Sequence, residues 1–451
     1  MTTSRHPAIR DWAWGVGVFV AAAAAFGHDL AGEPDFADEW AYVSQAYFWD
    51  ELARPHSARW LEYPAFDLPP LPKYVIGAAL RAAGYPLLPP EAARAWYRDI
   101  DRKFDPHAML LAARRPSVVF GAIGCAAAFA LGTMAFDRRV GLLAAGLLIV
   151  DPLYRMLARR AMSDIYAEGL ILTTCALGLL AWKRLLAGRR PTAGWVALLG
   201  AAGVLGGLAV LAKLNGGLAL LVLAGWSAIA ARRGPLGIRR FLAVLTGTAL
   251  AGAAAFATFV ALNPFLTARP KVPLPAEMRR IAAMGSLGRC VQLVRHRLAV
   301  PRDQQRMFPH NALITPQEKI AVVAVQGFGR FGPLGRKRFD PARGTWWFDS
   351  TRRFDWHQDA GAILWLPLVA AGAVVYRRRG VRQDQRGDPP TARAVLLQAG
   401  VTLLIVTIYL PLAWDRFFLS IQAASCLLAS GAIVAAWDRL MAHRAGRAVP
   451  P

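Results

Sequence analysis

Long apolar runs that approach the thickness of a lipid bilayer constrain this chain more than any other feature. Stretches of Ala, Leu, Val and Gly recur along its 451 residues, and about 20 apolar residues are enough to cross a bilayer as a helix. Hydrophobic residues make up 55% of the chain, and the mean hydropathy is +0.33. The sequence therefore predicts an all-α polytopic membrane protein.

About ten of these runs are long enough to be transmembrane helices. They cover residues 12–27, 116–136, 140–153, 165–182, 194–212, 214–231, 241–262, 360–376, 394–412 and 417–437. The short loops on one side are rich in arginine, for example "RRGPLGIRR" and "RRRGVRQDQR", which predicts that this side is cytoplasmic. Arg5 and Arg10 place the N-terminus there too, and the first run lacks a small-residue cleavage site, so it is expected to stay as a helix.

The two long polar segments are then periplasmic, and the predicted location is the inner membrane of a bacterium. Residues 1–262 are expected to form an N-terminal transmembrane catalytic module that includes a first periplasmic loop, 28–113. Residues 263–359 would form a periplasmic loop or lid that orders on substrate, and 360–451 the C-terminal transmembrane helices. The apolar stretch 68–85 is short and interrupted by charge, which favours an interfacial helix.

Charge and cysteine content narrow the function classes. A net charge of +24 would suggest nucleic acid in a soluble protein, but here the basic residues cluster in loops, where they favour a membrane topology and anionic headgroups. The four cysteines show no paired spacing, so neither a disulfide framework nor a zinc site is expected.

The stretch "PDFADEWAYVSQAYFWD" places Asp38 and Glu39 among aromatic residues just after the first apolar run. One interpretation is a solvated acidic turn shared with Glu33 and Asp35. The other is a general base, because a carboxylate in a partly dry cleft can accept a proton from a hydroxyl nucleophile.

Further charged groups lie near the same predicted membrane boundary. Arg159 and Asp164 precede the fourth run, Lys213 lies in an outer turn, and Arg416 follows the ninth run. A basic interfacial patch or snorkelling side chains would explain them without function. Ionisable groups among membrane spans are nevertheless candidates for function, and together with Asp38 they predict one external cleft for a lipid-linked phosphate.

Short motifs in a fixed order along the chain resemble the polyprenyl-phosphate-sugar-dependent glycosyltransferases of the GT-C superfamily. This group includes the protein O-mannosyltransferases and the lipid A aminoarabinose transferases. The motifs are "DEWAY" (Asp38, Glu39), "PPLPKY" (Lys73), "RRPSVVFGAIG", "ARRAMSDIY" (Arg159, Asp164), "AKLNGG" (Lys213) and "WDRFFLS" (Arg416). Leu68 departs from the pattern, because the family often has His or Lys before "PPL".

The resemblance implies a role for each of these residues. Asp38 would be the catalytic base or would orient the acceptor, and Glu39 would help to shape the donor site. Arg159 would bind the donor phosphate, with Lys213 and Arg416 sharing that task. In supporting roles, Asp164 would position the arginines and Lys73 would contribute from its own motif.

The implied activity is transfer of a monosaccharide, hexosyl or pentosyl, from a polyprenyl-phosphate carrier to a hydroxyl of a periplasmic protein, lipid or glycan, with inversion. One alternative is a lipid or solute transporter. Transporters tend to show paired broken helices in two repeated halves, which the sequence lacks. A second alternative is a polysaccharide ligase that uses a pyrophosphate-linked donor.

The second periplasmic segment adds residues whose role stays open. His296, His310 and His357 lack the tight spacing of a metal site. No metal ligands are assigned, no cofactor is specified, and a divalent metal remains an alternative. Trp346 and Trp347 could stack on a sugar or lie at the membrane interface.

Overall fold

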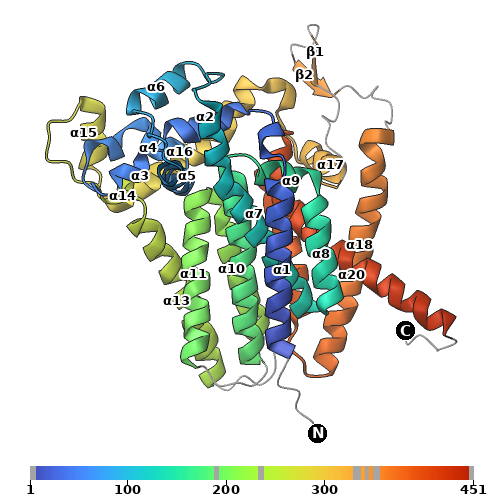
Figure 1. The fold of residues 1–451 in the computed structure, drawn as a ribbon. Helices are drawn as coiled ribbons and strands as arrows, with labels where there is room; N and C mark the ends of the chain where they lie inside the picture. The colour runs from blue at the N-terminus through green and yellow to red at the C-terminus, as the bar shows by residue number, and fades with distance from the viewer. Residues whose placement is uncertain are drawn as a thin grey trace.

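A computed structural model of the chain describes residues 7–186, 192–231, 238–328, 337–340, 345–348 and 356–445. Side chains are described for residues 12–186, 192–231, 238, 241–328 and 363–445. Helices dominate the structure, and they form a bundle of long helices with a layer of short helices at one end (Figure 1).

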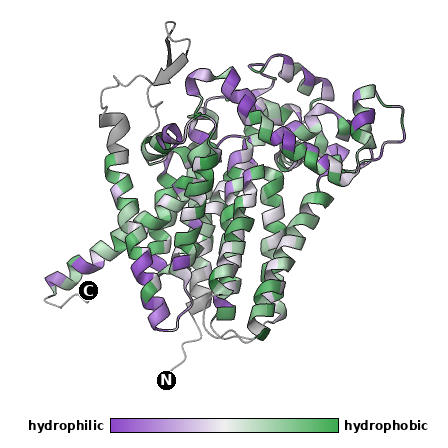
Figure 2. Cartoon of the chain, turned by 180° about the vertical axis from the view of Figure 1, so that it is seen from behind, coloured by the Kyte–Doolittle hydropathy of each residue, from purple (hydrophilic) through white to green (hydrophobic). Residues whose placement is uncertain are grey.

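A long helix stands at each of the ten positions predicted for a membrane span. The ten helices are α1 (Pro7–Gly27), α7 (His107–Ala135), α8 (Arg138–Val150), α10 (Ser163–Leu186), α11 (Ala193–Ala212), α12 (Gly217–Ala231), α13 (Ile238–Ala261), α18 (Trp356–Gln385), α19 (Thr391–Tyr409) and α20 (Leu419–Arg444). Their apolar surfaces form a broad band across the bundle, with polar residues concentrated beyond its ends (Figure 2). The chain is thus an all-α, multi-pass membrane protein, as predicted.

The predicted number of spans is only partly supported. Within the described residues, seven helices are long and apolar enough to cross a membrane, and an eighth span results if the bent pair α8 and α9 (Pro152–Ala158) is counted as one. The first helix contributes a shorter apolar stretch, Trp12–Gly27. Length and composition therefore support seven or eight spans among the described residues, and the count of about ten stays a prediction.

A bend between α8 and α9 divides the third predicted apolar run, residues 140–153. The two helices meet at 69°. Asp151 ends α8 and also caps α9, because its carboxylate accepts a hydrogen bond of 2.8 Å from the backbone N–H of Tyr154. Pro152 follows at the first position of α9, where a missing N–H is tolerated. The run is interrupted by a capped break.

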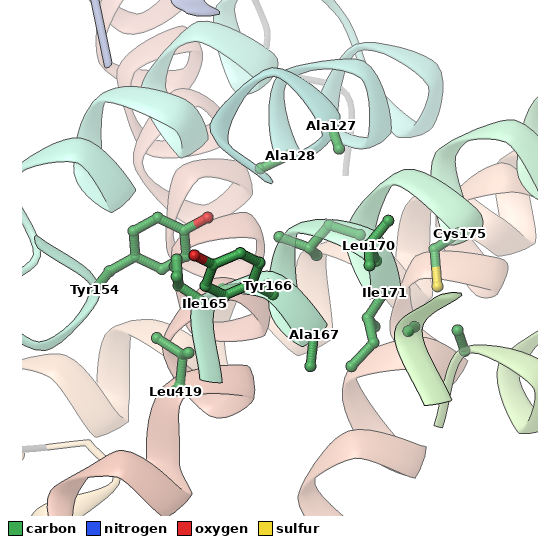
Figure 3. Packing of buried hydrophobic residues seen from close by; sticks show 14 of the residues in the cluster. Ala127, Ala128, Tyr154, Ile165, Tyr166, Ala167, Leu170, Ile171, Cys175 and Leu419 are labelled. Carbon is green, nitrogen blue, oxygen red and sulfur yellow. The ribbon is translucent and has the colours of Figure 1, made fainter. Parts of the chain in front are cut away.

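Small residues allow the long helices to approach closely. A Cβ atom at Gly203 or Gly207 on α11 would lie 2.4 Å from a backbone carbonyl oxygen of α13, that of Ala251 or Ala255, which is the small-xxx-small contact common between membrane helices. Figure 3 shows the core where α10 meets its neighbours, with Ile165 and Tyr166 of α10 beside Tyr154 of α9.

The short helices form what we call the cap, the layer at the end of the bundle opposite the N-terminus (Figure 1). Its helices are α2 (Ala37–Ser44), α3 (Phe48–Glu51), α4 (Tyr63–Asp67), α5 (Pro70–Ala82), α6 (Pro90–Arg98), α14 (Pro264–Thr267), α15 (Ala276–Ala283), α16 (Ser286–Met307) and α17 (Pro316–Gln326). Short 3-10 turns connect or extend them: η1 (Leu30–Gly32), η2 (Ala58–Leu61), η3 (Leu214–Gly216), η4 (Pro309–Asn311) and η5 (Asp415–Phe418). A two-stranded antiparallel hairpin, β1 (Lys337–Asp340) with β2 (Thr345–Phe348), lies beyond it.

Both predicted periplasmic segments contribute to the cap and pack against each other. Helix α5, the predicted interfacial helix, has 13 residues and is too short to cross a bilayer. The Tyr74 hydroxyl of α5 donates a hydrogen bond of 3.2 Å to the carbonyl of Leu262, and Phe66 of α4 packs on Phe265 with ring centroids 4.9 Å apart. The part of segment 263–359 that comes before residue 329 is thus joined to the first segment.

Candidate active site

Asp38 and Arg416 meet where the cap joins the bundle. Asp38 lies in the first turn of α2, where the helix dipole favours a negative charge, and Arg416 lies in η5 just before α20. The guanidinium Nη1 of Arg416 donates to a carboxylate oxygen of Asp38 across a separation of 378 residues. Side-chain exposure is 35% for Asp38 and 19% for Arg416, so the carboxylate remains accessible.

A second ion pair, between Asp164 and Lys213, lies beside the first. The Lys213 ammonium, at the end of α11, lies 2.6 Å from a carboxylate oxygen of Asp164 at the start of α10. The ring of Phe417 lies 5.7 Å from the Lys213 ammonium and 5.8 Å from the Arg416 guanidinium. One aromatic ring therefore contacts a cation of each pair, and we call these four charged residues the charge cluster.

Tyr42 completes the buried wall of the charge cluster, and the sequence analysis did not single it out. It lies one helical turn after Asp38 on α2, is 4% exposed, and hydrogen-bonds to Ser163. Burial raises the pKa of the Tyr42 hydroxyl well above its usual range. It is therefore a neutral hydroxyl beside two carboxylates, and the signal that could have identified it is its spacing of four residues from Asp38.

The helix α16 brings a further cation to this region, which the sequence analysis also missed. The Nη2 of Arg297 donates a hydrogen bond of 3.0 Å to the carbonyl of Phe66, and its charge acts on Tyr42, Asp67 and Lys73. No short motif surrounds Arg297, so only the packing of α16 on α4 reveals it.

Asp67 anchors α16 to the first cap segment through a network of hydrogen bonds. It accepts from the Tyr97 hydroxyl at 2.6 Å and from the Tyr63 hydroxyl at 3.1 Å, and its carboxylate lies 3.2 Å from His296 Nε2. Burial opposes ionisation of Asp67, but the hydrogen bonds from His296 and Tyr97 and the charge of Arg297 outweigh it and lower its pKa to about 2. Asp67 thus connects α4, α6 and α16 as a carboxylate.

Glu39 has a structural position, unlike its neighbour Asp38. Because successive helical residues point about 100° apart, Glu39 faces inward and is fully buried. Both its oxygens lie 2.8 Å from the guanidinium of buried Arg114, and it also accepts from the backbone N–H of Phe36 and of Ala161. These four hydrogen bonds hold α2 in place, and the predicted contribution of Glu39 to the donor site stays a prediction.

Arg159, predicted to bind the donor phosphate, instead fastens the chain around η1. Its guanidinium donates to the carbonyls of His28 (2.6 Å) and Asp29 and lies 3.3 Å from the carboxylate of Glu33. Its side chain is only 7% exposed. The structure thus brings Lys213 and Arg416 into the charge cluster and places Arg159 on the backbone around η1, and the role of Arg159 in binding the donor phosphate stays a prediction.

Lys73, predicted to support the site, also faces away from the charge cluster. It is fully buried, its ammonium donates to the backbone carbonyls of Pro64 and Ala65, and it lies 4.9 Å from the centre of the Phe48 ring. Burial and the charge of Arg297 lower the pKa of Lys73 well below its usual value. Its contacts fix the course of α4, which carries Asp67.

The charge cluster is held together from below by a buried contact between α10 and α20. The Ser420 hydroxyl donates a hydrogen bond of 2.5 Å to the carboxyl group of Glu168. Glu168 lies one turn after Asp164, and Ser420 lies one turn after Arg416. This contact therefore fixes the position of Asp164 relative to Arg416 along the axis of the bundle.

The described residues contain no group of three or more His, Cys, Asp or Glu side chains that could hold a metal ion. His296 is bonded to Asp67, and His310 packs on Phe308 with ring centroids 6.4 Å apart. The side chains of His357, Trp346 and Trp347 lie outside the described residues.

Comparisons with known proteins agree with this architecture. Residues 59–260 match the family model for dolichyl-phosphate-mannose-protein mannosyltransferase. This range includes Lys73, Asp164 and Lys213, whereas Asp38 and Arg416 lie outside it. No curated protein sequence matches the chain.

Three solved structures illustrate the structural similarity. The oligosaccharyltransferase of Archaeoglobus fulgidus in its apo form has a TM-score of 0.55 at 16% identity, over 96% of this chain and 51% of that one. The same enzyme, AglB, with an inhibitory peptide and a dolichol-phosphate has a TM-score of 0.53 at 16% identity, over 96% and 51%. ArnT from Cupriavidus metallidurans bound to undecaprenyl phosphate has a TM-score of 0.49 at 16% identity, over 95% and 62%.

The chain spans about half the length of the archaeal enzyme, and at this identity the likeness concerns the fold. It covers nearly the whole of the present chain, including the cap and the bundle. Together with the family match over residues 59–260, it agrees with the resemblance seen in the sequence: the chain has the fold of the archaeal oligosaccharyltransferase, and part of it matches the mannosyltransferase family model.

Proposed function

We propose that this protein is an integral membrane glycosyltransferase that moves a monosaccharide from a polyprenyl-phosphate donor to an acceptor hydroxyl, with inversion. The observation that carries this proposal is the Asp38–Arg416 pair with Asp164 and Lys213 beside it. The charge cluster lies at the junction of bundle and cap, where a donor anchored in the membrane and a polar acceptor can both reach it.

The four charged residues suit the steps of such a transfer. Asp38, the more accessible carboxylate, accepts the proton of the acceptor hydroxyl, and the oxygen of that hydroxyl attacks the anomeric carbon of the donor sugar. The bond between that carbon and the phosphate oxygen breaks, and its electron pair leaves with polyprenyl phosphate. Arg416 and Lys213 stabilise the charge that develops on the leaving phosphate, and attack from the opposite face inverts the anomeric centre.

Neighbouring residues support these roles. Asp164 holds Lys213 at 2.6 Å and so orients its ammonium. Tyr42 offers a neutral hydroxyl beside Asp38, and Arg297 supplies a further positive charge from the cap. Glu39 and Arg159 act indirectly, because their bonds hold the segment before and within α2.

The comparisons supply independent support for a lipid-linked donor. The archaeal oligosaccharyltransferase, which has this fold, was solved in complex with a dolichol-phosphate, a phosphate on a polyprenyl-type chain. We extend this ligand class to the present protein as its donor. The acceptor would be a protein, lipid or glycan on the periplasmic side, with the cap facing the periplasm of the inner membrane.

An assay of the purified protein with synthetic polyprenyl-phosphate sugars and a panel of acceptors tests the proposal. We expect Asp38→Asn to lower kcat by about 100-fold or more and to leave donor affinity largely unchanged. Asp50→Asn is the matched control, since Asp50 is a cap carboxylate paired with Arg81, and it should keep full activity. Wild-type turnover in Asp38→Asn would contradict the role of Asp38 as the general base. Movement of the donor across a vesicle membrane without formation of product would favour a transporter.

A further inference from the structure

A basic pocket lies at the end of the bundle opposite the charge cluster. It has a volume of about 250 Å³ and is formed where the ends of α7, α10 and α18 and the start of α19 come together. Asp164 and Lys183 lie near opposite ends of α10, about 28 Å apart at 1.5 Å per residue. The pocket is therefore separate from the proposed glycosyltransferase site.

Among the described residues, four cations and one carboxylate line this pocket. Lys183 comes from α10, Arg379 and Arg382 from α18, and Arg386 from the turn after it, with Asp388 as the carboxylate. Guanidinium groups match the oxygens of a phosphate in paired hydrogen bonds, and a lysine adds a point charge. Such a lining selects an anion with several oxygen atoms.

Two buried polar atoms of the lining have no partner among the described residues. They are the Nε of Arg379, whose guanidinium lies 5.5 Å from the centre of the Phe136 ring, and the Oγ1 of Thr133. Buried polar atoms are normally hydrogen-bonded. The lining therefore keeps unused hydrogen-bonding capacity: the Arg379 guanidinium lines the pocket with its Nε unpaired, whereas the Thr133 hydroxyl lies against Gly141 of α8.

An apolar crevice adjoins the pocket and shares Lys183, Pro389 and Thr391 with it. Its other walls include Leu179, Trp182 and Leu186 of α10 and Trp226 and Ile229 of α12. A free anion gains nothing from contact with these apolar side chains, whereas a hydrocarbon chain is stabilised by burying its apolar surface against them. The pocket is also smaller than the roughly 300–1,000 Å³ typical of drug-sized ligands, which suits a headgroup.

We propose that this pocket binds the phosphate group of an anionic membrane lipid, with a hydrocarbon chain of that lipid against the crevice. Basic pockets between transmembrane helices on the positively charged side of a membrane protein commonly hold anionic headgroups. The bound lipid bridges α10, α18 and the turn before α19, and so joins the C-terminal helices to the centre of the bundle at the end remote from the cap.

The test uses the full-length protein in phosphatidylcholine nanodiscs, titrated with dioctanoyl phosphatidylglycerol and followed by native mass spectrometry. We expect Lys183→Gln and Arg379→Gln each to raise the Kd about five- to tenfold. Arg378→Gln is the matched control, because Arg378 is the exposed neighbour on the same helix and does not line the pocket. It should bind as the wild type does.

Further arms separate the lipid from other anions. Inorganic phosphate should bind at least tenfold more weakly than the lipid, because it lacks the chain that packs against the apolar walls of the crevice, and dioctanoyl phosphatidylcholine should not compete. Equal affinity in all four proteins, or equal affinity for inorganic phosphate and the lipid, would overturn the proposal. If Arg379→Gln does not fold, Arg386→Gln at an exposed lining position provides the same comparison.

Discussion

Asp38 and Arg416 lie 378 residues apart in the chain and form an ion pair between α2 and η5. One comes from the first cap helix and the other from the last turn before the final helix, so the pair closes the bundle around the charge cluster. Because the Arg416 guanidinium also lies within electrostatic reach of Asp164, this one cation connects both carboxylates of the proposed site.

Arg416 should therefore be the most sensitive cation for turnover. We expect Arg416→Ala to lower kcat by about 100-fold or more, because it removes a charge that stabilises the departing phosphate and leaves Asp38 without its partner. Arg416→Lys should recover part of the activity, since it restores charge without the planar fork. Steady-state kinetics checks this, with Arg306→Ala, an 82% exposed cap arginine, as control. Equal loss in Arg306→Ala would contradict a specific role.

Substitution of Lys213 should weaken donor binding, whereas substitution of Arg159 should lower thermal stability. Lys213→Ala is expected to weaken binding of polyprenyl phosphate about tenfold, because it removes one of the two cations of the charge cluster. Arg159→Ala should leave that affinity unchanged but lower the Tm, because its guanidinium holds the carbonyls of His28 and Asp29. The Kd for polyprenyl phosphate and the Tm, both measured on the same samples of the two variants, test these expectations. Lost affinity in Arg159→Ala at an unchanged Tm would restore Arg159 as the phosphate ligand.

Adjacent carboxylates in "DEWAY" should give opposite phenotypes. We expect Glu39→Ala to lower the free energy of unfolding by about 3–5 kcal/mol, because it breaks the fully buried ion pair with Arg114 and leaves only the carboxylate of Asp35, 3.6 Å away, near that guanidinium. Asp38→Asn should change it by about 1 kcal/mol or less, since its pair is partly exposed, while activity is lost. Denaturant unfolding in detergent, paired with the transfer assay, measures both. A stable Glu39→Ala protein would show that the buried pair does not hold α2.

Asp67 should make the cap sensitive to acid. Its pKa falls from the ordinary value of 3.8 to about 2 in the folded protein. The stabilisation that the ionised Asp67 carboxylate gives to the folded protein is present above about pH 4 and is lost as the pH falls through 2. A difference of nearly two pKa units corresponds to about 2 kcal/mol.

Thermal unfolding between pH 5 and pH 2 tests this expectation. The loss of Tm on acidification should be smaller in Asp67→Asn than in the wild type, because that variant has no carboxylate to protonate here. Asp101→Asn, an exposed cap position, should follow the wild-type curve. If Asp67→Asn does so as well, the His296–Asp67–Tyr97 network does not supply this pH dependence.

Local patterns in the sequence were enough to predict the class of fold and most of the site's components. A helix stands at each of the ten apolar runs, with one run broken between α8 and α9, because a backbone in lipid must satisfy its hydrogen bonds within the segment. The spacing of charged motifs along those runs brought Asp38, Asp164, Lys213 and Arg416 to one boundary, and the structure pairs them as carboxylate with cation.

Only the tertiary structure decided which charged residues join the charge cluster and which hold the fold. Asp38 and Glu39 are chemically alike and adjacent, but the turn of α2 directs Asp38 to Arg416 and Glu39 to Arg114. Arg159 is bound by carbonyls that lie about 130 residues earlier, and Arg297 reaches the site through packing of α16 on α4. Such contacts depend on the orientation of side chains between distant segments, and no local sequence pattern encodes that orientation.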